Sequence, residues 1–394
     1  MNRYLFLLLF QALLCDGLHA QTLTPEKKGE LALEIDNLSF FKDNEYEGEQ
    51  SRGYSLPGFW IQPKLTYQPL AQVRLEAGFH ALVFDGANKY PCYAYHDIGV
   101  WKGSQYQRGA HVLPFFRAQA QMGAVSLVLG DIYGAEHHEV MEPLWNPELT
   151  LTQDPEMGFQ ILADLPRWKL DAWLNWQSYI FQEATHQEAF TVGIHQRILL
   201  NATAQRLHWY LPIDILIQHR GGEQDITDLG VQTITNGGVG IGMKWNAQSR
   251  VLQNLSAEVA ALGCWQQSGS IWPFNTGAAA TISVSALFQK NISVSGGLFY
   301  AKDFVSLYGA PFYSTLSVKH SGARFSRMLT PHVGVEWKHD FSKDYTFGAK
   351  ADYFPLSAGA LTHPAGAVDP ATYANNFSFG VYFRCRPRFL LKRF

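Results

Sequence analysis

The densest group of chemically versatile side chains is a run of two histidines and two glutamates in one predicted loop: His137, His138, Glu139 and Glu142. Imidazoles and carboxylates this close together could bind Zn²⁺ or another divalent ion. Their spacing, HHExxE, differs from the HExxH spacing that sets two histidines on one helical face. The pattern therefore favours an ordered loop with solvated or capping acids, and metal binding is the alternative.

A second set of charged side chains recurs at every other position of segments that are otherwise apolar. If the apolar positions face lipid, the charges face the interior of a barrel, since an Arg or Lys in lipid near the bilayer midplane costs about 2–4 kcal/mol. Inside, they either brace the wall or shape the field that a solute meets. The two signs nearly balance, so no ion preference follows. The predicted lumen-lining residues are Arg74, Glu76, His80, Arg117, Asp171, His195, Arg197, Asp214, Lys244, Glu258, Glu336, Lys338, Asp340, Lys350 and Asp352.

Other motifs are less informative. The glycine-rich segment 236–242 is followed by continued alternation and not by a helix, so a phosphate cradle is disfavoured. Removal of an export signal would leave three cysteines, Cys92, Cys264 and Cys385, which form neither a disulfide framework nor a CxxC pair. No nucleophile–His–acid arrangement is evident. We expect no cofactor and no enzymatic activity, with a membrane-boundary hydrolase using His80, His137 or His138 as an alternative.

Composition excludes several classes of protein. Of the 394 residues only 16% are charged, against about 25% in soluble domains, whereas 14% are aromatic and 47% hydrophobic. This apolar content excludes disorder. A net charge of −3 and no dense basic stripe argue against nucleic-acid binding. Only one apolar run approaches membrane length, so a polytopic helical membrane protein is also excluded.

That apolar run lies at the N-terminus and is typical of an export signal. Arg3 precedes an apolar core from Tyr4 to Leu14, and the small residue Ala20 marks a cleavage site. The core is too short to span a bilayer of about 30 Å. Cys15 raises a lipoprotein alternative, but the bulky Leu14 before it disfavours acylation. We predict a cleaved signal at 1–20 and a mature chain at 21–394.

The mature chain repeats about ten residues of strict apolar–polar alternation followed by a turn. Period two is typical of a strand, because successive side chains leave opposite faces of the pleat. Segments of nine to twelve residues suit tilted membrane-crossing strands, and aromatic residues gather near their ends as in an interfacial girdle. The clearest examples are Val73–Phe84, Leu170–Phe181, His208–His219, Tyr345–Tyr353 and Phe377–Arg384.

The connections alternate between short and long, which allows a topology to be predicted. Placing Phe312–His320 within one long loop gives sixteen strands, with both termini on the short-turn side. Backbone amides cannot stay unpaired in hydrocarbon, so such strands should close on themselves. We predict an all-β fold: a single closed antiparallel up-and-down transmembrane β-barrel with short periplasmic turns and long extracellular loops. A soluble β-sandwich or propeller is the alternative.

Several segments carry a resemblance to a known group of proteins. They are GDIYGAEHHEVMEPLWNPELTLTQD (130–154), LDAWLNWQSYIF (170–181), HQEAFTVGI (186–194) and LIQHRGGEQD (216–225). With these, the chain resembles uncharacterised exported outer-membrane β-barrel proteins of Bacteroidota, which are regarded as porin-like. The resemblance implies an outer-membrane location and transfers no site residues.

The favoured function is a porin-like passive or substrate-restricted channel for small solutes, narrowed if loop 133–156 or 303–331 folds inward. The expected partners are outer-membrane lipid and an unknown solute, without nucleic acid, in a homo-oligomer or beside a surface lipoprotein. One alternative is a barrel that docks such a lipoprotein through loops 84–111 and 133–156; another is a rim-site hydrolase. At the C-terminus, either the last strand continues through Pro387 or residues 385–394 form a basic periplasmic tail.

Overall fold

The computed structural model describes residues 23–84, 109–179, 183, 185–202, 205–222, 230–247 and 249–394. The predicted signal peptide, the isolated Cys92 and nearly all of the predicted docking loop 84–111 lie outside these residues. In the described part of the chain, none of the helices is long and apolar enough to cross a bilayer.

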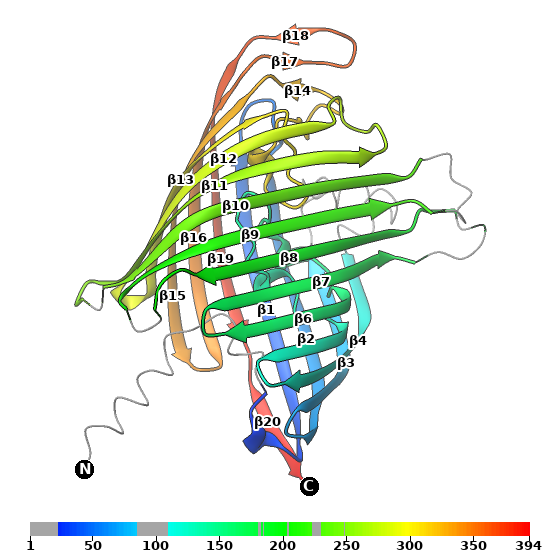
Figure 1. Cartoon of the computed structure of the whole chain (residues 1–394), viewed down its shortest axis with the longest axis vertical. Coiled ribbons are helices and arrows are strands. Elements are labelled where there is room, and N and C mark those ends of the chain that lie inside the picture. The colour runs from blue at the N-terminus through cyan, green and yellow to red at the C-terminus, as the bar shows by residue number, and fades with distance from the viewer. Residues whose placement is uncertain are drawn as a thin grey trace.

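The described residues form a closed antiparallel barrel of sixteen strands, as predicted (Figure 1). Consecutive strands pair with one another, and the ring closes where β1 pairs with both β2 and β19. The wall strands are β1 (Glu30–Tyr46), β2 (Tyr54–Leu70), β3 (Val73–Phe84), β4 (Gly109–Met122), β5 (Val125–Asp131), β6 (Met157–Leu165), β7 (Trp168–Ser178), β8 (Ala189–Leu199), β9 (Leu207–Arg220), β10 (Gln232–Asn246), β11 (Leu252–Ser268), β12 (Thr276–Phe288), β13 (Ile292–Lys302), β15 (Met328–Ser342), β16 (Tyr345–Ala358) and β19 (Thr372–Cys385).

Short turns and long loops gather at opposite ends of this wall. We call these the short-turn end and the long-loop end. A small sheet of β14 (Arg324–Phe325), β17 (Leu361–Thr362) and β18 (Val368–Asp369) stands at the long-loop end, at the top of Figure 1. The short helices are η2 (Pro25–Lys27), η4 (Ala135–His137), α3 (Leu149–Thr152), η5 (Gln289–Asn291) and η6 (Pro311–Tyr313).

The C-terminal residues continue the last strand and do not hang free as a basic tail. Strand β20 (Arg388–Arg393) pairs with the first residues of β1, directly below the stretch of β1 that pairs with β19. Pro387 lacks an amide hydrogen and interrupts the strand, yet its carbonyl accepts a hydrogen bond from Ile35 at 3.1 Å. The backbone pairing therefore survives the proline.

The apolar sides of the strands face outward, as a lipid-facing wall requires. On β3, for example, Leu75 and Phe79 are exposed, whereas Glu76 and His80 between them are buried inside. On the inner face, some aromatic rings lie over a glycine that is directly opposite on the neighbouring strand. These aromatic–glycine pairs fit closely. A Cβ added to Gly193 would meet the Trp173 ring at 2.0 Å, and one added to Gly242 would meet Tyr210 at 2.2 Å.

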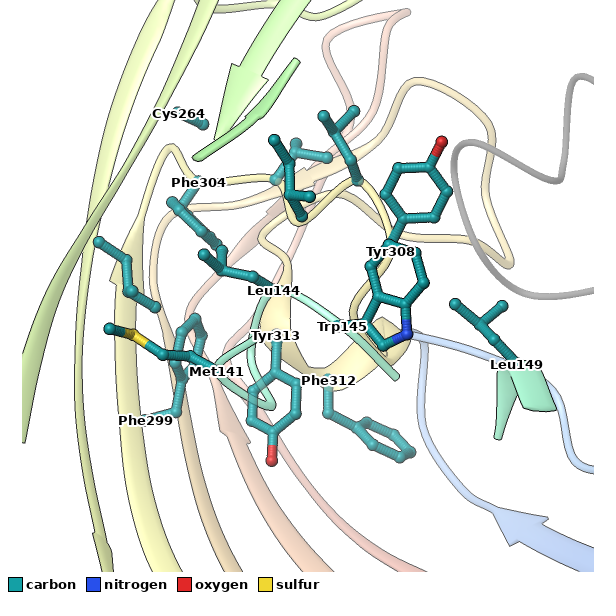
Figure 2. Packing of buried hydrophobic residues seen from close by; sticks show 14 of the residues in the cluster. Met141, Leu144, Trp145, Leu149, Cys264, Phe299, Phe304, Tyr308, Phe312 and Tyr313 are labelled. Carbon is teal, nitrogen blue, oxygen red and sulfur yellow. The ribbon is translucent and has the colours of Figure 1, made fainter. Parts of the chain in front are cut away.

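The largest difference from a water-filled pore is an inner protein layer. Residues 132–156 and 303–327, here called the plug, fold from the long-loop end into the lumen and form much of the hydrophobic core. Trp145 and Tyr308 stack with ring centroids 4.9 Å apart, and Asn146 N donates to the Tyr308 carbonyl at 2.8 Å. Figure 2 shows these side chains packed together inside the wall. Phe312 belongs to the plug, which confirms that Phe312–His320 is no wall strand.

Candidate functional site

The plug is attached to the barrel wall on several sides. Asn236 on β10 exchanges hydrogen bonds with the backbone of Val305 and Leu307, at 2.8 and 2.7 Å. Gln177 on β7 donates to the Tyr308 hydroxyl at 2.9 Å. Across the lumen, Phe312 stacks on Phe354 of β16 with centroids 5.0 Å apart. These contacts place packed protein across the space that a solute would have to traverse.

The run predicted as a metal site belongs to this attachment. His138 has a fully buried side chain, held by Asp171 at 2.6 Å and Glu156 at 3.3 Å. Glu139 pairs with Arg197 at 3.0 Å, and Glu142 accepts from Tyr313. His137 instead packs edge-on against Tyr133. The four side chains diverge to separate partners, and among the described residues no three His, Cys, Asp or Glu side chains are placed to hold a metal ion.

Electrostatics explains why His138 can be buried here. Burial alone would lower the pKa of His138, but the carboxylates of Asp171 and Glu156 outweigh it and raise that pKa to about 9. The imidazolium also stacks on Trp173 with centroids 3.6 Å apart. A cation enclosed by two acids and a ring is a structural clamp between the plug and β7.

The predicted lumen-lining residues occupy inward-facing positions of the wall strands. Many of them pair with each other or with the plug: His195 bonds Asp214 at 2.6 Å, Lys350 pairs with Asp352 at 3.3 Å, and Arg197 pairs with Glu139 of the plug at 3.0 Å. Their part in selecting a solute stays a prediction. The buried members are Glu76, His80, Arg117, Asp171, His195, Asp214 and Asp352; the half-buried members are Arg74, Arg197, Glu258, Glu336 and Lys350; Lys244, Lys338 and Asp340 are exposed.

A different feature lies on the outer surface: a groove of about 410 Å³ crosses β1, β19, β16 and β15. Its floor follows from the strand register, because Phe379 and Val335 both lie opposite the small residue Ala351. The next row is walled by Phe377 and Tyr353, whose rings stack at 4.7 Å. Apolar side chains around an alanine floor make a slot suited to a hydrocarbon chain.

The groove ends in polar groups at the long-loop end. Asp43 and Glu45 lie on the outward side of β1, opposite Phe379 and Phe377 respectively. Asp43 is three residues from the end of its strand, roughly 10 Å at the usual rise per residue. Two acids side by side on an otherwise apolar outward face are candidates for function, because the other outward positions of the wall carry mainly apolar side chains.

Asp43 has a hydroxyl partner. Ser55 lies directly opposite it on β2 and donates from Oγ to the Asp43 Oδ1 at 2.6 Å. Beside this pair, the Tyr353 hydroxyl donates to Asn375 at 2.7 Å. A hydroxyl held by a carboxylate is one arrangement of a nucleophile and its proton acceptor.

Sequence reasoning missed this site, although a signal was present. In 39–45 the outward positions read Ser39, Phe41, Asp43 and Glu45, so the charges fall on the face that should be apolar. Charged side chains on this outward face are an exception to the pattern in which apolar side chains face the lipid. The groove itself arises from pairing between strands far apart in sequence, which periodicity alone does not reveal.

Comparison with known protein families corrects one expectation. A family described as "Lipid A 3'-O-deacylase-type" matches residues 23–394 of this chain. Because that description names an enzyme family, the prediction that the chain has no enzymatic activity is wrong. No curated protein gives a significant match. The predicted kinship with Bacteroidota proteins stays a prediction.

Several solved structures of outer-membrane proteins match this chain at low sequence identity. OmpT, an outer-membrane protein of Vibrio cholerae, is 12% identical; the match covers 90% of this chain and 99% of that chain, with a TM-score of 0.48. OprD from Pseudomonas aeruginosa is 9% identical, with 93% and 97% covered and a TM-score of 0.48. Acinetobacter baumannii OccAB3 is 10% identical, with 91% and 99% covered and a TM-score of 0.48. These likenesses concern the fold alone.

Proposed function

This chain belongs to the lipid A 3'-O-deacylase-type family, and from that premise we propose that it is an outer-membrane esterase that removes an acyl chain from lipid A. The exposed apolar side chains of the wall support a location in the outer membrane, where lipid A resides. The short-turn end then faces the periplasm, and the long-loop end faces outward.

The observation that carries the proposal is the outward groove with a polar mouth. An acyl chain of a neighbouring lipid A molecule would lie over Ala351, between Phe379 and Val335. Its ester group would then approach Asp43 and Ser55 at the level where the hydrocarbon gives way to head groups. The substrate reaches this site from the membrane and does not enter the lumen.

The chemistry assigned to the pair is acyl transfer to a hydroxyl. Ser55 Oγ attacks the ester carbonyl carbon while its proton passes to the Asp43 carboxylate. The C–O bond to the sugar breaks, and the sugar oxygen leaves with that proton. Water then attacks the acyl–Ser55 ester, which releases the fatty acid and restores the hydroxyl.

A wide passive channel receives less support than the sequence suggested. The plug crosses the lumen, donates and accepts hydrogen bonds with β7 and β10 and stacks on β16, so little continuous water-filled space would serve conduction. The predicted docking surface is also reduced, because loop 133–156 turns inward and does not present itself to a lipoprotein.

Filling the groove tests the proposal. Ala351→Phe places a ring on the groove floor, and Ala349→Phe adds the same ring to an outward position outside the groove lining. Fatty-acid release from lipid A in mixed micelles should fall at least tenfold for Ala351→Phe and stay near wild type for Ala349→Phe. Absence of release by wild-type protein, or equal release by both variants, would contradict the proposal.

A further inference from the structure

A second cavity lies inside the barrel, toward the short-turn end. It measures about 400 Å³ and is lined by β1 to β4, both ends of the plug segment 132–156 and the junction of β19 with β20. This volume is within the range of small-molecule sites, about 300–1,000 Å³. The esterase site does not use this cavity, because the Asp43–Ser55 pair lies on the opposite face of the wall.

The cavity is electropositive although the whole chain is acidic. Its charged lining comprises seven basic and five acidic side chains, whereas the full sequence has a net charge of −3. The basic ones are Lys27, Lys64, Arg74, Arg117, Arg384, Arg386 and Arg388; the acidic ones are Glu34, Asp36, Glu76, Asp154 and Glu156.

The carboxylates of this lining are shared among several cations. Glu76, whose side chain is buried, pairs with Lys64 at 2.8 Å, Arg74 at 2.7 Å and Arg117 at 3.4 Å. One carboxylate has only two oxygens, while each guanidinium offers five N–H donors. The donors around Glu76 therefore outnumber the lone pairs that it supplies.

The same imbalance recurs along β1. Glu34 forms ion pairs with Arg74 at 2.7 Å and with Arg388 at 3.2 Å. Asp36 forms ion pairs with Arg384 at 2.7 Å and with Arg386 at 3.4 Å. Three acids of the lining thus pair with six cations around one space, and Arg388 also pairs with Glu30, outside the lining, at 2.6 Å.

The field of these cations reaches Lys27, which precedes the barrel. Burial lowers the pKa of Lys27, and repulsion from Arg388 and Arg74 lowers it further. A bound anion would relieve this repulsion.

We propose that this cavity binds the phosphate group of a small water-soluble phosphomonoester entering from the periplasm. Planar guanidinium forks match phosphate oxygens in pairs, and a dianion neutralises the local excess of two positive charges. The cavity is lined by the inward faces of the strands, so a ligand reaches it from water. A lipid in the outer groove lies on the other side of the wall.

Isothermal titration of the full chain in detergent tests this binding. Glucose 1-phosphate and inorganic phosphate should both bind, and glucose should give no heat. Lys27→Gln/Arg386→Gln removes two positive charges while Arg384 remains on Asp36, so both phosphate affinities should fall at least tenfold. Arg393→Gln, whose guanidinium pairs with Glu30 outside the cavity lining, should bind like wild type.

Two results would overturn the assignment. One is binding by the double variant within twofold of wild type, and the other is equal weakening by Arg393→Gln. Unboiled gel mobility confirms that each variant is folded, and the single variant Arg386→Gln replaces the double variant if that one fails to fold. The outcome is independent of esterase activity, since neither position lies at the outward groove.

Discussion

His138 in the plug and Asp171 on β7 lie 33 residues apart in sequence, yet their side chains meet at 2.6 Å in the interior of the barrel. Glu156 approaches the other ring nitrogen of His138 at 3.3 Å. The contact fixes the position of the plug, because an imidazolium with two carboxylate partners is costly to withdraw or to leave unpaired.

Replacing this histidine should loosen the plug. His138→Phe keeps a ring against Trp173 but leaves two buried carboxylates without their cation, a change that typically costs about 3–5 kcal/mol. We expect a lower thermal midpoint and faster proteolytic cleavage within 132–156. His339→Phe, at an exposed position, is the control and should match wild type. Equal protease resistance of His138→Phe and wild type would show that the clamp is unimportant.

The same contact predicts a response to alkaline pH. Since the folded-state pKa of His138 is raised to about 9, its stabilising effect is complete below about 6.5 and is lost as pH rises through 9. Trp145 and Trp173 lie against the ring, so tryptophan emission should change with a midpoint near pH 9. His138→Phe should lack this transition, and its persistence in that variant would exclude His138 as the origin.

The aromatic–glycine pairs should be intolerant of even one methyl group. In Gly193→Ala the new Cβ would lie 2.0 Å from the Trp173 ring, so the ring or the strand must shift, at a cost of about 1–3 kcal/mol. Gly296→Ala is the matched control, because its nearest contact would be an ordinary 3.5 Å. The temperature at which the folded gel band disappears should be lower for Gly193→Ala than for Gly296→Ala. Equal temperatures would indicate that the strands shift to accommodate the methyl group at little cost.

Loops at the long-loop end should respond to acid. Hydrogen bonds from His320 and Lys319 lower the pKa of Glu49 below its usual 4.5. Their stabilising effect is therefore present above pH 4.5 and disappears as pH falls through the lower, folded-state value. Glu49, His320 and Lys319 are partly exposed, so their ion pairs contribute less than about 1 kcal/mol to the free energy of unfolding. The small difference in thermal midpoint between wild type and Glu49→Gln should shrink on acidification; a constant difference would refute the link.

The barrel could be predicted from sequence because the alternation of a strand and the length of a turn are properties of short segments. Alternation at Val73–Phe84 places Glu76 and His80 on one face whatever the neighbouring strand is, and short turns set the order of pairing. Closure then follows from the need to pair every backbone amide in lipid. Phe312–His320 could be assigned to a loop by strand parity alone.

The candidate site could not be predicted in the same way. Ala351 becomes a groove floor only because Phe379 and Val335 on two other strands lie opposite it. The partners of His138 likewise depend on how a long loop folds within the lumen. Asp43 and Glu45 were the local clues, since they break the apolar pattern of an outward face.

Two serines on the outward side of adjacent strands allow the esterase proposal to be tested directly. Ser55 bonds Asp43 at 2.6 Å, whereas Ser39 on β1 bonds only weakly to Asn37, at 3.4 Å. Mass spectrometry of lipid A incubated with purified protein should show loss of one 3'-linked acyl chain with wild type and Ser39→Ala. With Ser55→Ala, the same lipid should stay fully acylated. Undiminished deacylation by Ser55→Ala, or intact lipid A with folded wild-type protein, would contradict the account.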